Sequence, residues 1–466
     1  MALARLIDRT AEMARLESAW ADVQGGSARL VVVTGRRQVG KTFLLAHMLE
    51  RIKPFARTVF LTALPGLGRT QQLRAAVRGM RIQLDDPWLP DRFESWGAAL
   101  RWLLSTASSG DPIAVVIDEV PYLTDADPGF AGEVQQVWDE VRRQQRQPRI
   151  LLVLTGSSVA TMTTLTASSG ALFGRPDDEL VIHPFDLPTA ATVLTNLSPE
   201  GVVEAYAACG GYPNHLRSWD QSEDVRTNLA RLYFTAGGLL LRNGEQLMAD
   251  LPDESGHRRA LHAIGSGLHR RSEIEQAAAQ RLDRPLDLLQ RATLITHRRP
   301  LGAPDRTPGL WRILDPFLNC WYQLAWADAE QIEAGLGDGV ASAREGRWQR
   351  HVGEVFEDQS RSHAVRLALA GRLPPETRYG EWWTTRGGQV QIDVLGLRGR
   401  RTVLIGEARW DARPSGDRVL EELRAKERAA PDPVTDPILA LWSRGGVADT
   451  IAGRVTSFTP HDMVAG

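Results

Sequence analysis

The sequence predicts an α/β protein whose first part is a doubly wound parallel sheet and whose last part is a second α/β domain. Three apolar runs in the first part, at 30–33, 112–123 and 149–158, are typical of buried parallel strands because they do not alternate with polar residues. Polar residues follow each run. Two further strand patterns, at 389–397 and 401–410, predict the second sheet.

Composition limits the classes of function that the chain can serve. The 466 residues suggest several domains, and 43% hydrophobic with 24% charged residues is typical of a folded, soluble protein. The net charge of −2 excludes a chain-wide basic field, so contact with nucleic acid would need a local patch. Two cysteines exclude a disulfide framework. With no signal peptide and no apolar run of membrane-spanning length, we expect a cytoplasmic location and no membrane partner.

The first strand leads into a phosphate-binding loop. Residues 35–42 fit G-x-x-x-x-G-K-[ST], and apolar residues at helical spacing follow in FLLAHML. Only three of the 55 basic side chains are lysines, Lys41, Lys53 and Lys426, so a lysine in this loop needs a local reason. A compact ammonium suits the β- and γ-phosphates better than a planar guanidinium. The residues expected to bind the nucleotide here are Gly35, Arg36, Arg37, Gln38, Val39, Gly40, Lys41, Thr42 and Phe43.

Two acids at the end of the second strand complete a site for NTP hydrolysis. Asp118 is expected to hold Mg²⁺ together with the hydroxyl of Thr42, and Glu119 to orient and deprotonate the attacking water. The third strand ends in hydroxyls, and either Thr155 or Ser157 could bond the γ-phosphate or the water, or else cap the next helix. The catalytic residues predicted are Lys41, Asp118, Glu119 and Arg175, the last as an arginine finger acting on its own or a neighbouring subunit's nucleotide.

These motifs together resemble the archaeal-type P-loop ATPases of the AAA+/STAND group. The resemblance spans roughly residues 5 to 320 and rests on LIDRTAEMARLESAW, TGRRQVGKT, VVIDEVPYL, LLVLTGSS, the FGR segment and CGGYPNHL. It implies ATP and Mg²⁺ as cofactors and a helical lid shaped by Gly211 and Pro213, and it makes a nucleotide-dependent homo-oligomer a candidate assembly. Asp8 departs from the family, which has glycine before the arginine, and this puts a base contact by Arg9 in question.

The middle of the chain predicts a winged helix. Three amphipathic helical patterns in 258–301 are followed by strand-like residues and a Gly/Pro-rich tongue at 299–309. Such a module can bind DNA, here through Arg284, Arg291, Arg298 and Arg299, or can serve as a lid or a protein contact. The aromatic stretch at 310–326 is interpreted as core.

The C-terminal strands resemble domain-of-unknown-function family number 234 and the PD-(D/E)xK nucleases. Asp393 matches the acid of the first strand and Glu407 the acid of G-E-x-[KR] on the second, while Glu357 in VFE matches a helix-borne carboxylate. The resemblance implies a divalent metal on these acids. Arg409 departs from the usual lysine, so the site either tolerates arginine or has lost its chemistry. The metal ligands predicted for the whole chain are Thr42, Asp118, Glu357, Asp393 and Glu407.

We therefore expect an ATPase that uses its nucleotide state to control a nuclease-like C-terminal domain, with nucleic acid as a candidate partner. The alternative is a nucleotide-gated signalling switch or scaffold of the STAND type with an inactive C-terminal domain. The expected segments are the P-loop ATPase domain (1–190), a helical lid (191–250), a winged helix (251–325), a linker or loose helix (326–346) and a restriction-endonuclease-like α/β domain (347–466).

Overall fold

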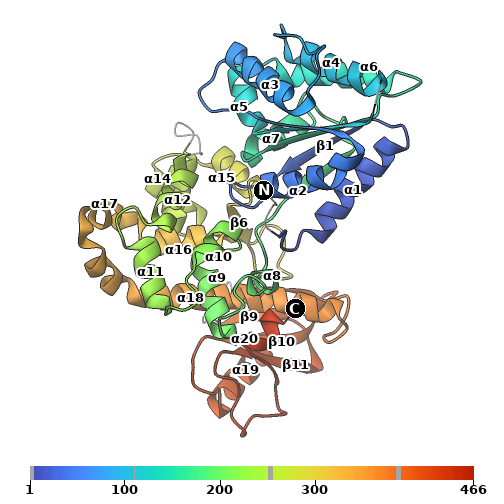
Figure 1. Ribbon diagram of the computed structural model, residues 1–466. Coiled ribbons are helices and arrows are strands. Elements are labelled where there is room, and N and C mark those ends of the chain that lie inside the picture. Colours follow the sequence, from blue (N-terminus) through green and yellow to red (C-terminus); the bar gives the residue numbers. More distant parts are fainter. Residues whose placement is uncertain (1–4, 110, 250–255, 385–389, 466) are drawn as a thin grey trace. The chain divides into compact units, whose positions relative to one another are not determined.

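The computed structural model describes residues 5–109, 111–249, 256–384 and 390–465 (Figure 1). The chain forms two compact units, one ending at Pro184 and one beginning at Phe185. The expected boundary between lid and winged helix, at 250/251, lies outside the described residues. In the part of the chain that the structure describes, no helix has the length and apolar character needed to cross a bilayer.

The first unit is built on the parallel sheet that the sequence predicts. Its strands lie in the order β2-β3-β4-β1-β5, and every pair is parallel. The second and third apolar runs form β3 and β4, whose side chains are buried throughout because helices cover both faces of the sheet. The strands are β1 (Arg29–Thr34), β2 (Arg57–Thr62), β3 (Ile113–Asp118), β4 (Ile150–Gly156) and β5 (Asp178–Val181).

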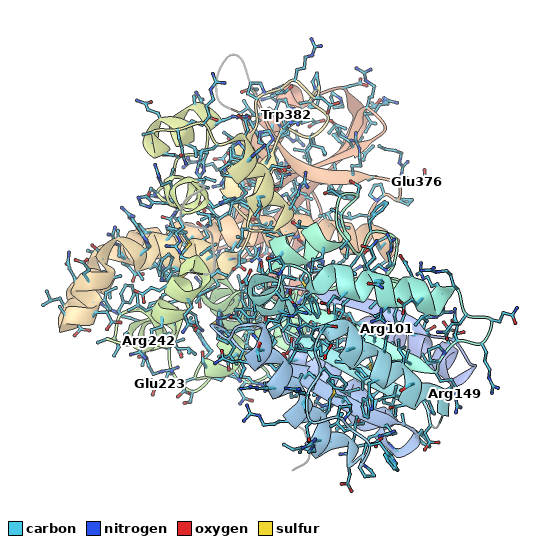
Figure 2. The ribbon with its side chains drawn as sticks, turned by 90° about the horizontal axis from the view of Figure 1, so that it is seen from above. Arg101, Arg149, Glu223, Arg242, Glu376 and Trp382 are labelled. Carbon is cyan, nitrogen blue, oxygen red and sulfur yellow. The ribbon has the colours of Figure 1, made fainter. Side chains whose placement is uncertain are left out.

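Helices lie on both faces of this sheet. In Figure 1, α3, α4 and α6 lie on one face, where Trp96, Phe130 and Trp138 are buried, and α1 and α2 lie on the other. Arg101 of α4 pairs with Glu140 of α6 on the surface (Figure 2). The helices are α1 (Thr10–Gln24), α2 (Lys41–Ile52), the 3-10 turn η1 (Lys53–Phe55), α3 (Arg69–Leu84), α4 (Trp96–Ser109), α5 (Val120–Ala126), α6 (Phe130–Arg142) and α7 (Val159–Thr166).

The second unit begins with helices. Three helices, α13 to α15, precede the antiparallel pair β6–β7, which is the order of elements expected for a winged helix. The elements are α8 (Leu187–Ala191), α9 (Pro199–Cys209), α10 (Pro213–Ser218), α11 (Val225–Tyr233), α12 (Leu239–Ala249), α13 (His257–Gly265), α14 (Arg271–Ala278), α15 (Asp283–Arg291), β6 (Ile295–Arg298) and β7 (Leu310–Ile313).

The aromatic stretch and the expected linker are both helical. In α16 (Pro316–Leu324), Phe317 and Trp321 are buried, as the core interpretation requires. The stretch 326–346, predicted as a linker or loose helix, is helical: η2 (Trp326–Asp328), α17 (Ala329–Gln331) and η3 (Ile332–Leu336) lead into α18 (Gly337–Leu369), which continues across position 346. Burial of Ile332 and Val340 holds this polar segment against the unit, and the Arg344–Asp328 ion pair joins its two ends.

The C-terminal sheet is mixed, with the order β12-β11-β10-β9-β8. Strands β8, β9 and β10 are antiparallel, whereas β10–β11 and β11–β12 are parallel, so α19 serves as the crossover between β10 and β11. The first residue of the predicted strand 389–397, Gln389, lies outside the described residues. The elements are β8 (Arg378–Trp383), β9 (Gln391–Arg398), β10 (Arg401–Arg409), α19 (Asp417–Ala429), β11 (Pro433–Ser443), β12 (Thr456–Phe458) and α20 (Pro460–Val464).

Candidate functional sites

The loop between β1 and α2 has a backbone that requires its two glycines. Gly35 has φ 151°, and a Cβ there would lie 2.5 Å from the carbonyl oxygen of Ile182. Gly40, immediately before α2, has φ 96°, and Gln38 between them also has a positive φ, of 67°. Backbone turns of this kind direct successive N–H groups towards one point, and α2 directs its positive end there too. The loop is therefore shaped as an anion-binding turn.

Lys41 is a buried cation whose described hydrogen bonds go to neutral groups. Its side chain, in a residue only 5% exposed, donates to the carbonyl oxygens of Gly35 (2.7 Å) and Arg36 (2.9 Å). Burial lowers the pKa of Lys41 to about 8, although the charges of Glu119 and Asp118 act in the opposite direction. A buried ammonium needs an anion to offset its desolvation, and this observation fits a phosphate group.

Thr42 and Asp118 meet at the end of β3. The hydroxyl of Thr42 donates to Oδ2 of Asp118 at 2.8 Å, and the other oxygen of Asp118 accepts the backbone N–H of Glu119 at 2.9 Å. Burial raises the pKa of Asp118, and the bond from Thr42 opposes this rise. A hydroxyl and a carboxylate within reach of the phosphate loop are oxygen donors of the kind that Mg²⁺ accepts. The donor set therefore fits the expected ion.

Glu119 is held by the end of the neighbouring strand. Its backbone is left-handed, with φ 56°, a conformation that is costly for a non-glycine residue and that clusters at functional sites. Its Oε2 accepts both the backbone N–H (3.1 Å) and the hydroxyl (2.7 Å) of Ser157. Thr155 is different: its Oγ1 is buried and has no hydrogen-bond partner among the described residues. Of the two expected hydroxyls, the structure brings Ser157 to the acid.

Two arginines connect the phosphate loop to neighbouring segments of the first unit. Arg9 donates to the carbonyl oxygens of Val39 (3.1 Å) and His183 (2.7 Å), which places a buried guanidinium against the loop backbone. Arg37 donates to the hydroxyl of Tyr122 at 2.7 Å and so links the loop to α5. From the sequence alone, the role in question for Arg9 was a contact to bases. The motif singled out Arg9 but did not predict that it holds the loop backbone, because this contact includes His183, more than 170 positions away.

Arg175 is held on α6. Its Nη2 and Nε lie 3.2 and 3.3 Å from the carboxylate oxygens of Asp139, and its Nη1 donates to the carbonyl oxygen of Phe173 at 2.7 Å. The described contacts of this side chain are thus with α6 and with its own loop. Its role as an arginine finger stays a prediction.

The expected lid residues have a structural role within the second unit. A Cβ on Gly211 would lie 1.9 Å from the carbonyl oxygen of Phe185. The backbone N–H of Phe185 in turn donates to the carbonyl oxygen of Gly211 at 2.8 Å. Pro213 is the first residue of α10. Glycine is therefore required by a close backbone approach, and proline begins a helix, where its missing N–H has no cost.

Asp393 and Glu407 lie on adjacent antiparallel strands of the C-terminal sheet, as predicted. The two strands pair Val394 with Gly406, so the acids are close neighbours in the ladder. Oδ2 of Asp393 accepts the N–H of Ala408 at 3.1 Å, and Oδ1 accepts from the amide of Gln391 at 3.2 Å. Both carboxylates are buried.

A third carboxylate, Glu357 on α18, belongs to the same electrostatic group. Burial, and then the charge of Asp393, raise the pKa of Glu357 to about 8 and also raise that of Glu407. The donor chemistry suits a hard divalent cation. However, no three His, Cys, Asp or Glu side chains in the described residues are arranged to hold a metal ion. Metal binding by Glu357, Asp393 and Glu407 therefore stays a prediction.

The lysine beside Glu407 does not come from the position that the nuclease motif predicts. That position is Arg409, and the lysine is Lys426. Nη2 of Arg409 lies 3.2 Å from Oε1 of Glu407 and also pairs with Glu422 on α19. Lys426, one turn further along α19, donates to Oε2 of Glu407. Sequence reasoning missed Lys426 in this site, although the scarcity of lysine had set it apart.

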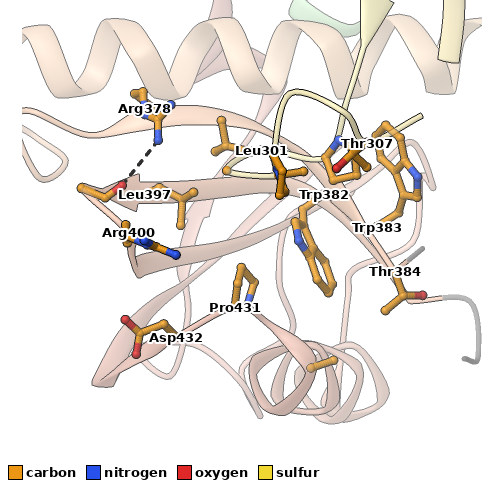
Figure 3. Close-up of a pocket in the computed structure, with 16 residues that line it drawn as sticks. Leu301, Thr307, Arg378, Trp382, Trp383, Thr384, Leu397, Arg400, Pro431 and Asp432 are labelled. Carbon is orange, nitrogen blue, oxygen red and sulfur yellow. Dashed lines mark hydrogen bonds between the residues drawn. The ribbon is translucent and has the colours of Figure 1, made fainter. Parts of the chain in front are cut away.

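Of the four arginines expected to bind DNA, Arg298 is the one that contacts the C-terminal part of the second unit. Arg298 pairs with Asp358 on α18, and the tongue after β6 joins β8 through a bond from the N–H of Leu301 to the carbonyl oxygen of Glu381 (2.9 Å). Figure 3 shows a pocket of about 620 Å³ where this tongue meets the sheet, with Trp382 in its wall. Exposed arginines elsewhere in the module also form ion pairs, Arg291 with Asp287 and Arg299 with Asp305, and Arg284 is exposed on α15.

A larger groove, of about 1110 Å³, lies beside this contact. Four arginines are among its lining residues, and it reaches the edge of the candidate C-terminal site, because Gln391, which bonds Asp393, lies in its wall. Its charged and aromatic lining residues include Arg270, Arg271, Arg306, Arg312, Trp311, Trp383 and Glu381.

Comparison with known proteins finds two family models, each of which matches a part of the chain. Residues 6–218 match the family described as an ATPase domain predominantly from Archaea. Residues 321–426 match family number 234, described as archaeal and bacterial proteins of unknown function. No curated protein matches the chain.

Solved structures are also similar to this chain. A Walker-type ATPase of Pyrococcus abyssi is 20% identical and superposes with a TM-score of 0.51, over 68% of this chain and 96% of that one. The ORC2 protein of Aeropyrum pernix, solved with ADPNP and ADP, is 14% identical with a TM-score of 0.44, over 74% of this chain and 97% of that one. The ORC1 protein of the same organism, solved with DNA, is 15% identical with a TM-score of 0.38, over 73% of this chain and 94% of that one.

Proposed function

Since residues 6–218 form an ATPase domain of the predominantly archaeal family and residues 321–426 a domain of family 234, we propose that ATP hydrolysis in the first unit controls a nucleic-acid-cleaving site in the second. The chain is an ATPase by its family. Control of the C-terminal domain, and the chemistry of that domain, are the parts that go beyond the family.

The hydrolytic half of the proposal rests on the contact between Glu119 and Ser157. Two bonds from Ser157 fix Oε2 of Glu119, which leaves Oε1 to accept a proton or a hydrogen bond from the attacking water. Lys41 and the loop amides would hold the β- and γ-phosphates, while Thr42 and Asp118 would hold the Mg²⁺ that neutralises their charge. The acid is thus held in place by contacts within the protein itself.

The cleaving half rests on the two adjacent strands that carry Asp393 and Glu407. Phosphodiester hydrolysis needs carboxylates that bind a divalent cation and a cationic side chain near the phosphate. In support, Glu407 lies beside two cations, Arg409 of its own strand and Lys426 of α19. The test is cleavage of duplex, single-stranded and branched DNA and RNA by the full chain, with Mg²⁺ or Mn²⁺ and with or without ATP. Cleavage that Glu407→Ala abolishes supports the proposal, and no cleavage of any substrate by the wild type contradicts it.

The groove beside β8 supports nucleic acid as the ligand. Arg306 and Arg270 are exposed in its wall, and Trp383 offers a ring on which a base can stack, a combination used for single strands. The nearly neutral chain has no general basic field, so this local patch supplies the charge. Anisotropy of a labelled single-stranded oligonucleotide tests it: Arg306→Ala should weaken binding at low salt, and Arg146→Ala, an exposed arginine of the first unit, should not.

One observation favours a second function. Glu407 is already engaged by two cations, an arrangement that a purely structural ion-pair network would also show. A nucleotide-gated scaffold with an inactive C-terminal domain would show an ATP-dependent rise in mass by light scattering, slow hydrolysis and no cleavage. Steady turnover without a change in mass would count against it.

A further inference from the structure

The cation expected beside Glu407 is directed towards the surface. In the G-E-x-[KR] layout the basic residue two positions after the glutamate extends from the same face of the strand, and this residue is Arg409. Its guanidinium pairs with Glu422 of α19, and its side chain is 36% exposed. The planar group is thus shared between two acids near the rim of the site.

Another cation occupies the inner position. Lys426 extends from α19 onto Oε2 of Glu407, and its side chain is only 18% exposed. Glu422 and Lys426 are four residues apart, so they lie on one face of α19 and meet Glu407 and Arg409 in a crossed arrangement of two acids and two cations. The deeper contact with Glu407 therefore belongs to the lysine.

The composition shows that a lysine at this point is unusual. Of the three lysines, Lys41 lies in the phosphate loop, and Lys53 is an exposed residue 3.5 Å from Glu50. In a chain that uses arginine almost everywhere else, a position that needed only an ion pair would be filled by arginine as readily as the Arg298 and Arg361 positions are. A compact ammonium with three donors suits a phosphate oxygen or a water molecule in a confined space.

We propose that Lys426 is the catalytic cation of the C-terminal site, contacting the phosphodiester, and that Arg409 is a positioning residue that holds α19 through Glu422. This inference rests on the proposed nuclease function. In the reaction, the oxygen of water bonds to phosphorus and one P–O ester bond breaks. The hydroxyl group of the water stays on phosphorus in the phosphomonoester product. The other proton of the water ends on the released sugar oxygen. Lys426 keeps its proton and stabilises the charge on the phosphoryl oxygens.

The first test compares cleavage by the full chain and three variants, with Mn²⁺. Lys426→Ala should lose about 100-fold in rate, of the order found when one charge-stabilising donor is removed. Lys53→Ala, the matched surface lysine, should leave it unchanged. The double variant Lys426→Ala/Arg409→Lys, which moves the lysine to the strand, should recover at least about tenfold over Lys426→Ala. A merely structural ion pair would not be rescued in this way.

The second test uses a spectroscopic signal of Lys426 instead of the cleavage rate of a variant. Reductive methylation with ¹³C-formaldehyde labels the three lysines and the amino terminus, and Lys53→Ala and Lys426→Ala identify their signals. Mn²⁺ at concentrations that support cleavage should broaden the Lys426 signal of the nucleotide-free protein while that of Lys53 stays sharp.

The outcomes separate the two ideas. If the wild type cleaves no substrate, both the proposed nuclease function and the role of Lys426 are overturned. If the wild type and Lys426→Ala cleave equally, or if Mn²⁺ leaves the Lys426 signal sharp, only the role of Lys426 is overturned.

Discussion

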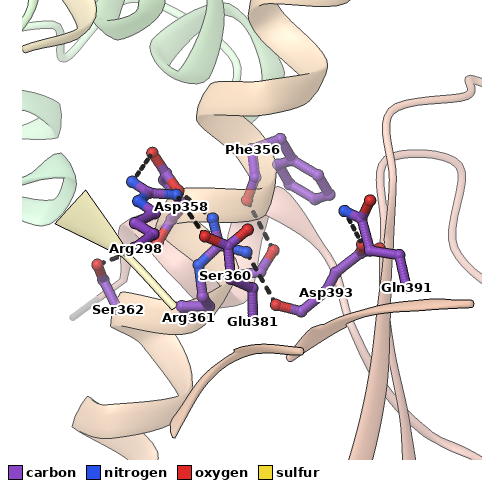
Figure 4. Close-up of polar contacts among 9 residues, drawn as sticks. All are labelled: Arg298, Phe356, Asp358, Ser360, Arg361, Ser362, Glu381, Gln391 and Asp393. Carbon is purple, nitrogen blue, oxygen red and sulfur yellow. Dashed lines mark hydrogen bonds and ion pairs between the residues drawn. The ribbon is translucent and has the colours of Figure 1, made fainter. Parts of the chain in front are cut away.

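Arg298 on β6 and Asp358 on α18 form a two-point ion pair, with Nη1–Oδ1 at 2.6 Å and Nη2–Oδ2 at 2.8 Å (Figure 4). Arg361, on the next turn of α18, also pairs with Asp358 and donates to the backbone carbonyl of Asp393 at 2.8 Å. Burial alone would raise the pKa of Asp358, but the two guanidinium groups hold it well below its usual range. One continuous set of contacts therefore joins the helical module to the strand that carries the candidate C-terminal acid.

Asp358→Asn should destabilise the second unit, because it leaves two guanidinium groups without their shared carboxylate. Since about a third of the Asp358 side chain is exposed, we expect a loss of about 1–3 kcal/mol in the free energy of unfolding. Asp305→Asn removes the exposed partner of Arg299 and should cost less than about 0.5 kcal/mol. Urea denaturation followed by circular dichroism measures both. Equal effects of the two variants would contradict the structural importance of the Asp358 contacts.

Lys41→Ala should abolish nucleotide binding, while Glu119→Gln should bind ATP and not turn it over. The first change removes the cation that faces the phosphates, and the second keeps the shape of Glu119 but removes its ability to accept a proton. We expect at least a 100-fold weaker Kd for Lys41→Ala, by roughly the free energy of a buried charge–phosphate contact. Calorimetric titration and a phosphate-release assay check these outcomes, with Lys53→Ala as the control.

Ser157→Ala and Thr155→Val should show which of the two hydroxyls that the sequence left as alternatives contributes to ATP turnover. Loss of the Ser157 hydroxyl frees Oε2 of Glu119 and should lower ATP turnover by about tenfold or more, with little change in ATP affinity. Valine at 155 removes a buried hydroxyl without a partner among the described residues, so stability should be unchanged or higher. A fall in turnover for Thr155→Val and none for Ser157→Ala would reverse this assignment.

The stability of the second unit should fall in mild acid because of His215. Burial lowers the pKa of His215 to about 4, although its bond to the carbonyl oxygen of Cys209 acts in the opposite direction. The unfolded chain binds a proton below pH 6.5, whereas the folded chain does so only near pH 4, so stability is full above pH 6.5 and declines between these values. The loss can reach about 3 kcal/mol at pH 4. Denaturation midpoints between pH 7.5 and 4.5 measure it.

His215→Gln supplies the comparison for this pH effect. The variant removes the titrating group, so its stability should change less steeply with pH than that of the wild type. His363, whose pKa burial also lowers to about 4, keeps part of the slope. Parallel slopes for wild type and variant would show that His215 does not titrate as described.

The elements that the sequence predicted well are those encoded by local patterns. The phosphate loop, the acids after β3 and the paired strands of Asp393 and Glu407 each depend on residues within about fifteen positions of one another, so spacing alone locates them. Helix α18 was missed as a continuous element because its first turns are polar and contain glycine, and what holds them is a tertiary contact, the burial of Val340.

The parts that the sequence could not supply depend on contacts between distant segments. Lys426 reaches Glu407 only because α19 crosses over the sheet between β10 and β11, and no spacing rule predicts which turn of that helix faces the acid. Arg298 was a candidate for DNA because a basic residue near a wing is usually exposed. The structure instead pairs it with Asp358, since the tongue after β6 packs against β8.

The measurement that tests the central claim most directly is the rate of nucleic-acid cleavage by the full chain in the presence of no nucleotide, ADP or ATP, for wild type and Glu119→Gln. If nucleotide state controls the C-terminal site, ATP should change the rate several-fold, and Glu119→Gln should keep the ATP-bound rate long after wild type has returned to the ADP-bound rate. The same cleavage rate under all three conditions in both proteins would contradict the account.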